Sequence, residues 1–172
     1  RSTADALEAG PYDPVGRETE LDALWATAQT RFPTAVVRDS HYLLQRYGTD
    51  LRSPYVWVAV KNRGILAGVA VVRRPRPDGD ARLKGIRVAA LADVVYAPDQ
   101  PATGLALLGA VEHAAESLDA DAVVGTASAP ALQLLLRRQW YLPIAGNVHL
   151  LFRDVSGEPV TFGRALGDWW LT

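Results

Sequence analysis

The stretch LADVVYAPDQPATGLALLGAVEHAAESLDADAVV, residues 91–124, decides the fold. It begins as an apolar run, passes through a loop with Pro and Gly, continues with apolar residues at helical spacing, and ends in a second apolar run. This order predicts a strand, a helix and a second strand. Because such a crossover joins parallel strands, we expect the two strands to be parallel neighbours in one sheet.

The residues before this stretch predict two helices followed by an antiparallel meander. Apolar residues recur at helical spacing from Arg17 to Phe32, and Asp39 can cap a second helix, SHYLLQRY, that ends at Gly48. The apolar runs YVWVAV and ILAGVAVVRR are joined by KNRG, a hairpin-length loop. A third strand lies within RLKGIRVAALADVVYA, where Gly85 is available for a bulge.

The predicted fold class is α/β, of the α+β type. Its central mixed sheet is an antiparallel meander followed by a βαβ unit, with helices on both faces. After the stretch, ALQLLLRR predicts a helix capped by Ser128, and WYLPI and NVHLLFRD predict closing strands. We expect residues 1–14 to be a linker or disordered, residues 15–155 to form the domain, and residues 156–172 to be a C-terminal tail. Because the chain contains no Met, we also expect it to be part of a longer protein.

Composition excludes several classes of function. Lys and Arg number 18 against 19 Asp and Glu, so no basic surface for nucleic acid or membrane is indicated. With no Cys and three scattered His residues, neither a thiolate nucleophile nor a metal site is predicted. No apolar run is long enough to span a membrane, and the N-terminus lacks a signal-peptide core. We therefore expect a cytoplasmic protein with no nucleic-acid or membrane partner.

The predicted element order resembles the GCN5-related N-acetyltransferase (GNAT) fold over most of residues 17–154. Members of that family hold the pyrophosphate of acyl-CoA on backbone N–H groups at the start of the central helix, in a motif Q/R-x-x-G-x-G/A. Here PATGLA matches its last two positions with Gly104 and Ala106, whereas Pro101 stands where Gln or Arg belongs and Gln100 precedes it. The resemblance implies acetyl-CoA, or another acyl-CoA, as cofactor and a small-molecule amine, such as a sugar precursor, as acceptor.

A second, narrower resemblance lies in RDSHYLLQRYGTDLRSPYVWVAV. This run is similar to the D-x-x-Y-L-x-x-R-Y…Y segment of bacterial GNAT-like proteins that often carry two such domains in tandem and act in surface-polysaccharide biosynthesis. The matching positions are Asp39, Tyr42, Leu43, Arg46, Tyr47 and Tyr55, while Gln45 stands where those proteins commonly have Trp. The resemblance implies a second GNAT-like domain or a homodimer as partner.

The resemblance also implies the site residues. Acyl transfer needs a base for the amine and a proton donor for the leaving thiolate. The family's usual donor is a Tyr five residues before a GF pair; if Trp140-Tyr141 replaces that pair, the position is Leu136, which cannot donate a proton. We therefore assign Asp93 and Tyr96 as the candidate catalytic residues. The candidate cofactor-binding residues are Val94, Val95, Ala102, Thr103, Gly104, Leu105 and Ala106, and we predict no metal ligand.

Each of these residues also has a structural interpretation. Gly104 can relieve crowding at a tight turn, Asp93 can pair with a nearby Arg, and Tyr96 can serve in packing. The chain is then a catalytically silent GNAT-like domain that docks on a partner domain or subunit. A transferase taking an aminoacyl group from tRNA is a third alternative, which the neutral charge balance disfavours.

Overall fold

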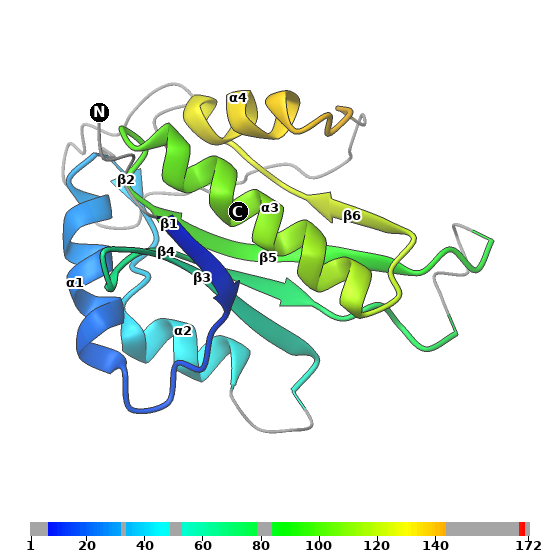
Figure 1. Cartoon of the computed structure of the whole chain (residues 1–172), viewed down its shortest axis with the longest axis horizontal. Coiled ribbons are helices and arrows are strands. Elements are labelled where there is room, and N and C mark those ends of the chain that lie inside the picture. The colour runs from blue at the N-terminus through cyan, green and yellow to red at the C-terminus, as the bar shows by residue number, and fades with distance from the viewer. Residues whose placement is uncertain (1–6, 32–33, 49–52, 79–83, 144–168, 171–172) are drawn as a thin grey trace, which may run out of the picture.

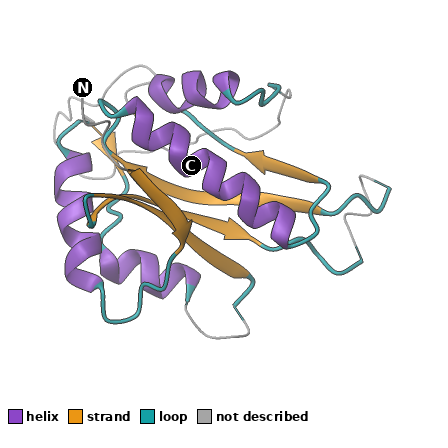
Figure 2. Ribbon diagram, viewed as in Figure 1, coloured by secondary structure: helices purple, strands orange, loops and turns teal. Residues whose placement is uncertain are grey.

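A five-stranded mixed sheet forms the centre of the molecule (Figure 1, Figure 2). The computed structural model describes residues 7–31, 34–48, 53–78, 84–143 and 169–170. The sheet has the order β1-β3-β4-β5-β6. Its strands are β1 (Leu7–Pro11), β3 (Tyr55–Asn62), β4 (Ile65–Arg73), β5 (Val88–Tyr96) and β6 (Ala122–Gly125). The α/β fold class with one mixed sheet is confirmed.

The predicted parallel pair is confirmed as β5 and β6. The two strands pair from Val88 opposite Ala122 to Leu91 opposite Gly125. Beyond Leu91, β5 continues for five residues, Ala92–Tyr96, of which Asp93–Tyr96 pair with β4 and none pairs with β6. Strand β6 ends at Gly125, so within the described residues no strand is paired with this backbone edge of β5 beyond Leu91, and we call this stretch without a paired strand the free edge.

The antiparallel meander is confirmed, but it has one more strand than predicted. Strands β3 and β4 form a hairpin whose turn is Arg63-Gly64, both with positive φ. Residues Leu7–Pro11, expected to be part of a linker, instead pair antiparallel with β3. The prediction for residues 1–14 is wrong at these positions: a short edge strand needs only backbone pairing, so it carries no strong apolar alternation. Residues 1–6 lie outside the described part of the chain.

A β-bulge in β5 changes which side chains face which side of the sheet. Val71 pairs with Asp93 and its neighbour Val72 pairs with Leu91, so Ala92 is the extra residue. Residues paired across two strands share a face, and neighbouring residues on a strand do not. Leu91 and Asp93 therefore point to opposite faces although they are two residues apart. The bulge lies at Ala92 and not at Gly85, which precedes the strand.

Helices cover both faces of the sheet, as predicted. Asp93 contacts residues around α2, whereas the ring of Tyr96 lies against α3, which crosses the sheet in Figure 1 beside α4. The helices are α1 (Glu18–Gln29), α2 (Ser40–Tyr47), α3 (Pro101–Ser117) and α4 (Pro130–Arg138). As predicted, the Asp39 carboxylate accepts a hydrogen bond from the Tyr42 amide at 2.8 Å and caps α2, and Gly48 ends it at φ 58°.

The C-terminal part differs from the prediction at two points. Helix α4 has Ala129 at its N-cap position and no side-chain cap, so Ser128 does not cap it. Within residues 156–172, expected to be a C-terminal tail, β7 (Trp169–Trp170) pairs in parallel with β2 (Thr34–Ala35). The segment WYLPI contains no strand in its first four residues, and the predicted strand at residues 147–154 lies outside the described part.

Candidate functional site

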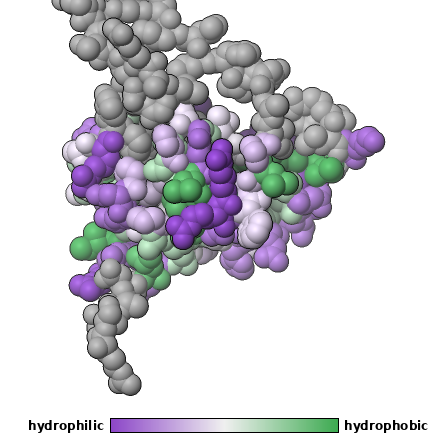
Figure 3. All heavy atoms as spheres, turned by 90° about the horizontal axis from the view of Figure 1, so that it is seen from above, coloured by the Kyte–Doolittle hydropathy of each residue, from purple (hydrophilic) through white to green (hydrophobic). Residues whose placement is uncertain are grey.

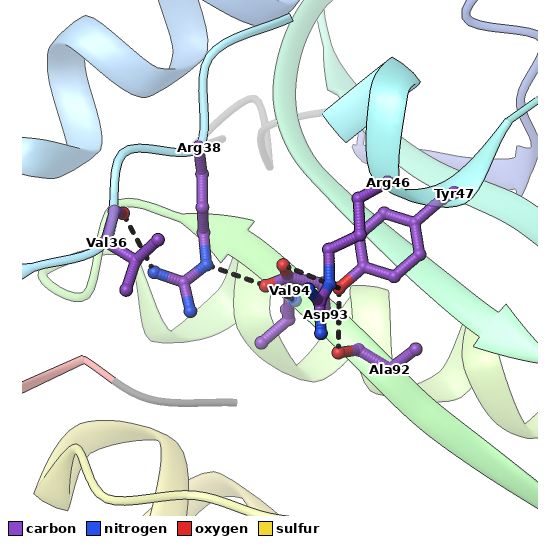
Figure 4. Close-up of polar contacts among 7 residues, drawn as sticks. All are labelled: Val36, Arg38, Arg46, Tyr47, Ala92, Asp93 and Val94. Carbon is purple, nitrogen blue, oxygen red and sulfur yellow. Dashed lines mark hydrogen bonds and ion pairs between the residues drawn. The ribbon is translucent and has the colours of Figure 1, made fainter. Parts of the chain in front are cut away.

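The carboxylate of Asp93 lies in a buried ion pair with Arg38 (Figure 4). Arg38 Nε is 2.7 Å from Asp93 Oδ1, and both side chains are 3% exposed. Arg38 comes from the segment before α2 and also donates to the carbonyl of Val36 at 3.1 Å. Asp93 Oδ1 further accepts a hydrogen bond from the Val94 amide at 2.9 Å. The interpretation of Asp93 as the partner of an arginine is therefore confirmed.

The second carboxylate oxygen of Asp93 is held by Tyr47. The Tyr47 hydroxyl lies 3.0 Å from Asp93 Oδ2 and 3.2 Å from the carbonyl oxygen of Ala92, the extra residue of the bulge. Arg46 Nε donates to the same hydroxyl at 3.2 Å. Burial and the nearby Asp93 charge raise the pKa of Tyr47, so the phenol keeps its proton and can donate it. We call Arg38, Tyr47 and Asp93 the buried triad.

The residues that carry the second resemblance surround this triad. Asp39 caps α2, Leu43 is buried in the core, and Tyr55 makes an edge contact with the Tyr47 ring at a centroid distance of 5.0 Å. Trp57 makes a similar contact at 6.2 Å. The motif therefore has a structural cause, since its residues build the helix and the packing that hold Tyr47 against β5. The tandem arrangement it implied stays a prediction.

The structure does not bring the two candidate catalytic residues together. Asp93 and Tyr96 are three apart on one strand, so their side chains point to opposite faces. The Tyr96 ring is 1% exposed and lies on the α3 side, against Gly104. Burial raises the pKa of Tyr96 to about 12, so this phenol also stays protonated at neutral pH. A shared role at one substrate is not supported by this geometry, and the catalytic role of each residue stays a prediction.

The first turn of α3 offers fewer backbone donors than its sequence suggested. Gln100 occupies the N-cap position, and its amide donates to Ala97 O at 2.9 Å. Pro101 has no N–H, and the Gly104 amide donates to Gln100 O at 3.2 Å. The amides of Ala102 and Thr103 are then the donors of the first turn without an intrahelical acceptor. Leu105 and Ala106 lie further inside the helix, where amides bond to the preceding turn.

Gly104 has a packing reason that is independent of any ligand. A methyl group at this position would collide with Leu135 Cδ1 of α4 and would come within 2.9 Å of Tyr96 Cε2. Gly68 of β4 is similarly placed, since its methyl group would lie 3.3 Å from Thr103, Leu107 and Tyr96. The two glycines therefore let α3 and the Tyr96 ring approach the sheet closely, as the crowding interpretation of Gly104 requires.

The free edge of β5 and the start of α3 form one continuous stretch of backbone. Val94 and Val95 are buried and belong to the core, so only their backbone can contact a ligand at the free edge. Four residues, Ala97 to Gln100, connect this edge to α3. Beside this connection, a hollow of about 700 Å³ between α1 and the β3–β4 hairpin reaches Ala97 and Gln100.

Other expectations concern metals, histidines and membranes. Within the described residues, no group of three or more acidic, His or Cys side chains could hold a metal ion. His41 and His113 are exposed, and His149 lies outside the described part. No helix among the described ranges is long and apolar enough to cross a bilayer. On the face seen in Figure 3, the apolar residues drawn in green form small groups between polar ones.

Comparison with solved structures identifies the fold, whereas comparison of sequences does not. No protein-family model and no curated protein matches the chain. A ribosomal-protein-alanine N-acetyltransferase from Brucella melitensis biovar Abortus 2308 superposes with a TM-score of 0.59 at 15% identity, covering 86% of this chain and all of that one. A GNAT family acetyltransferase of Staphylococcus aureus gives 0.57 at 12% identity, covering 85% and 98%.

A third similar structure is the aminoglycoside N-acetyltransferase AAC(6')-Iy in complex with CoA. It superposes with a TM-score of 0.55 at 11% identity, covering 90% of this chain and 97% of that one. The chain therefore has the GNAT fold, in agreement with the resemblance noted in the sequence. At these identities the likeness concerns the fold, and the activity must be argued from the site itself.

Asp93→Asn should lower the stability of the protein, because it leaves the Arg38 guanidinium buried without its counter-charge. Breaking a buried ion pair by removing one partner costs about 3–5 kcal/mol. The matched control is Asp99→Asn, which breaks the half-exposed pair Arg31–Asp99 of the same 2.7 Å length and should cost about 1 kcal/mol or less. Urea unfolding of both variants measures the difference, and equal losses would contradict a structural role for Asp93.

Gly104→Ala should be less stable than Gly109→Ala by about 1–3 kcal/mol, the usual cost of overpacking. Both glycines lie in α3, so replacement by Ala raises the helix propensity equally at the two positions. A methyl group at Gly109, however, meets nothing within 4 Å. Thermal or urea unfolding of the two variants is the measurement. Equal stabilities would show that α3 shifts freely and that packing is not the reason for Gly104.

Proposed function

We propose that this protein is an acyl-CoA-dependent N-acyltransferase that transfers an acyl group, acetyl in the simplest case, to the amine of a small molecule. The observation that carries the proposal is the free edge of β5, Ala92–Tyr96, which leads within four residues to the first turn of α3. An extended pantetheine arm can add to a strand edge by backbone hydrogen bonds, as peptides do. The free amides of Ala102 and Thr103 would then meet the diphosphate.

The helix start suits an anion even without the family's Gln or Arg. Unpaired N–H groups and the positive end of the helix dipole favour negative charge within the first turn. Ala102 is exposed, so a ligand can reach its amide, and Pro101 fixes the backbone of the turn. One of the similar structures, the aminoglycoside N-acetyltransferase AAC(6')-Iy, was solved with CoA bound, and this supports CoA as the cofactor class.

The proton transfers of the reaction place demands on residues that are buried here. In acyl transfer, the acceptor nitrogen attacks the thioester carbonyl, loses a proton, and the thiolate leaves and gains one. Both oxygens of Asp93 have hydrogen-bond partners, so as a base it must first give up part of the buried triad. We propose that water receives the amine proton, and that Tyr96, which stays protonated, is the candidate donor to the thiolate.

A catalytically silent GNAT-like domain is the second candidate function. The specific observation in its favour is that Asp93 and Tyr96 are both buried and point to opposite faces of the sheet. Leu136 of α4, where the family commonly has a Tyr proton donor, packs against the core. In this alternative the domain docks on a partner domain or subunit and has no turnover of its own.

Thermal unfolding with and without CoA and acetyl-CoA tests the proposal. A ligand present at 100 times its dissociation constant stabilises the folded state by about 2.7 kcal/mol, and a shift in Tm should result. Pantetheine, which lacks the phosphates, should shift the Tm less at the same concentration. Steady-state transfer of acetyl from acetyl-CoA to a panel of primary amines then separates the enzyme from the silent domain. A protein that neither gains stability with CoA nor acetylates any amine contradicts the proposal.

Ala102→Glu should weaken CoA binding by roughly tenfold or more without lowering stability. The added carboxylate repels the phosphates at short range, whereas a negative charge in the first turn favours the helix itself. Since Ala102 is exposed, the longer side chain meets no crowding. Ala102→Gln is the neutral control of equal size. Isothermal titration with CoA measures the affinities, and equal binding by the two variants would place the cofactor elsewhere.

A further inference from the structure

We infer that Tyr47 is a positioning residue for the acyl-binding edge of β5: its hydroxyl holds the bulge at Ala92 and thereby sets the direction of the free edge. The inference rests on the proposed function for the role of that edge. The geometry that links Tyr47 to the bulge is independent of it.

The bulge needs a partner that the sheet does not provide. Because Ala92 is the extra residue between the pairs Val71–Asp93 and Val72–Leu91, its backbone lies outside the regular ladder with β4. Ala92 is half-buried, and a carbonyl shielded from water without a hydrogen bond is costly. The Tyr47 hydroxyl lies 3.2 Å from Ala92 O and 3.0 Å from Asp93 Oδ2, so its single proton is shared between these two acceptors.

The same hydroxyl also contacts the residue that follows the bulge. It lies 3.0 Å from Asp93 Oδ2, so one phenol spans the backbone of Ala92 and the side chain of Asp93 (Figure 4). If the bulge relaxed into regular pairing, the strand would shift by one residue and Asp93 would turn to the α3 face, away from Arg38. Tyr47 and the ion pair therefore hold the same register from two sides.

Tyr47 is itself held in place. It is 4% exposed, its ring makes edge contacts with Tyr55 and Trp57, and Arg46 Nε donates to its oxygen. A hydroxyl placed in this way has little freedom to leave the bulge. Helix α2 and strand β3 thus fix the backbone of β5 from outside the proposed cofactor site.

The bulge stands at the point where the free edge begins. The last residue of β5 that pairs with β6 is Leu91, and the next residue is Ala92. Alternate residues of a strand direct their amides to opposite edges, so the position of the bulge decides which amides of Asp93–Tyr96 face the free edge. The rate of acyl transfer from a thioester held at this edge depends on which amides face it, because a misplacement of about 1 Å can lower the rate about a hundredfold.

Tyr47→Phe tests the inference, since it removes the hydroxyl and retains the ring that packs on Tyr55 and Trp57. We expect kcat/KM for acetyl-CoA to fall roughly ten- to a hundredfold, mainly through kcat. Affinity for free CoA should fall less than kcat/KM, because the contacts of its phosphates with the first turn of α3 do not involve Tyr47. Hydrogen exchange should become faster at the amides of residues 91–97, while exchange in α3 is unchanged.

Tyr42→Phe is the matched control, because it removes a phenol oxygen from the same helix and should leave kinetics and exchange unchanged. Arg46→Ala, at an exposed position, removes the donor to the Tyr47 hydroxyl and should show a smaller loss in the same direction. If Tyr47→Phe fails to fold, Arg46→Ala carries the test.

If wild type binds no acyl-CoA, the proposed function fails, and amide exchange in β5 alone decides the role of Tyr47. The inference is overturned if the amides of residues 91–97 exchange at the wild-type rate in both Tyr47→Phe and Arg46→Ala. If the wild type is an active enzyme, an unchanged kcat/KM in both variants also overturns it.

Discussion

A buried pair of opposite charges, Arg38 and Asp93, is the interaction on which the rest of this structure depends. Each charge alone would be costly in the interior, and removal of one partner leaves the other uncompensated. The pair therefore ties the segment before α2 to strand β5, across 55 residues of sequence. A well-packed apolar pair can be as stabilising as an ion pair, so the contribution of these charges lies in specificity: only one register of β5 brings Asp93 to Arg38.

The bulge at Ala92 follows from this constraint. An apolar strand buried on both sides has little in its alternation to fix its register, and β5 is buried in this way from Asp93 to Tyr96. With the bulge, Leu91 and Val94 face α3 while Asp93 faces α2. The carboxylate therefore lies outside the closely packed layer between the sheet and α3, where Gly68 and Gly104 stand. The charge is confined to one face of the sheet, and close packing dominates the other.

The sequence predicted the elements where periodicity was strong and missed what depends on contacts between distant residues. The crossover from Leu91 to Val124, the cap at Asp39 and the hairpin at Arg63-Gly64 are local patterns, and all are present. An apolar strand with one Asp also indicated that a cation must be near. Nothing in the spacing pointed to Arg38 among 18 basic residues. The bulge was likewise hidden, because an extra residue in an apolar run leaves no change of composition. That Asp93 and Tyr96 face opposite sides, in contrast, follows from their odd spacing alone and could have been inferred before the structure was known.

The contrast between a well-matched fold and an unmatched sequence has a physical explanation in the proposed site. Among the residues described, Asp93 and Tyr96 are turned into the interior, and the groups that the free edge and the first turn of α3 present are mainly backbone amides. A site made of amides requires a strand that parts from its neighbour, a bulge in the right place and a helix that starts close by, and it places few demands on residue type. A site of this kind can in principle keep its geometry while its side chains change, and the fold itself is shared at 11–15% identity with TM-scores of 0.55–0.59. The side chains that matter most for the backbone of β5 are then those that hold it from the α2 side, Arg38 through Asp93 and Tyr47 through Ala92 and Asp93.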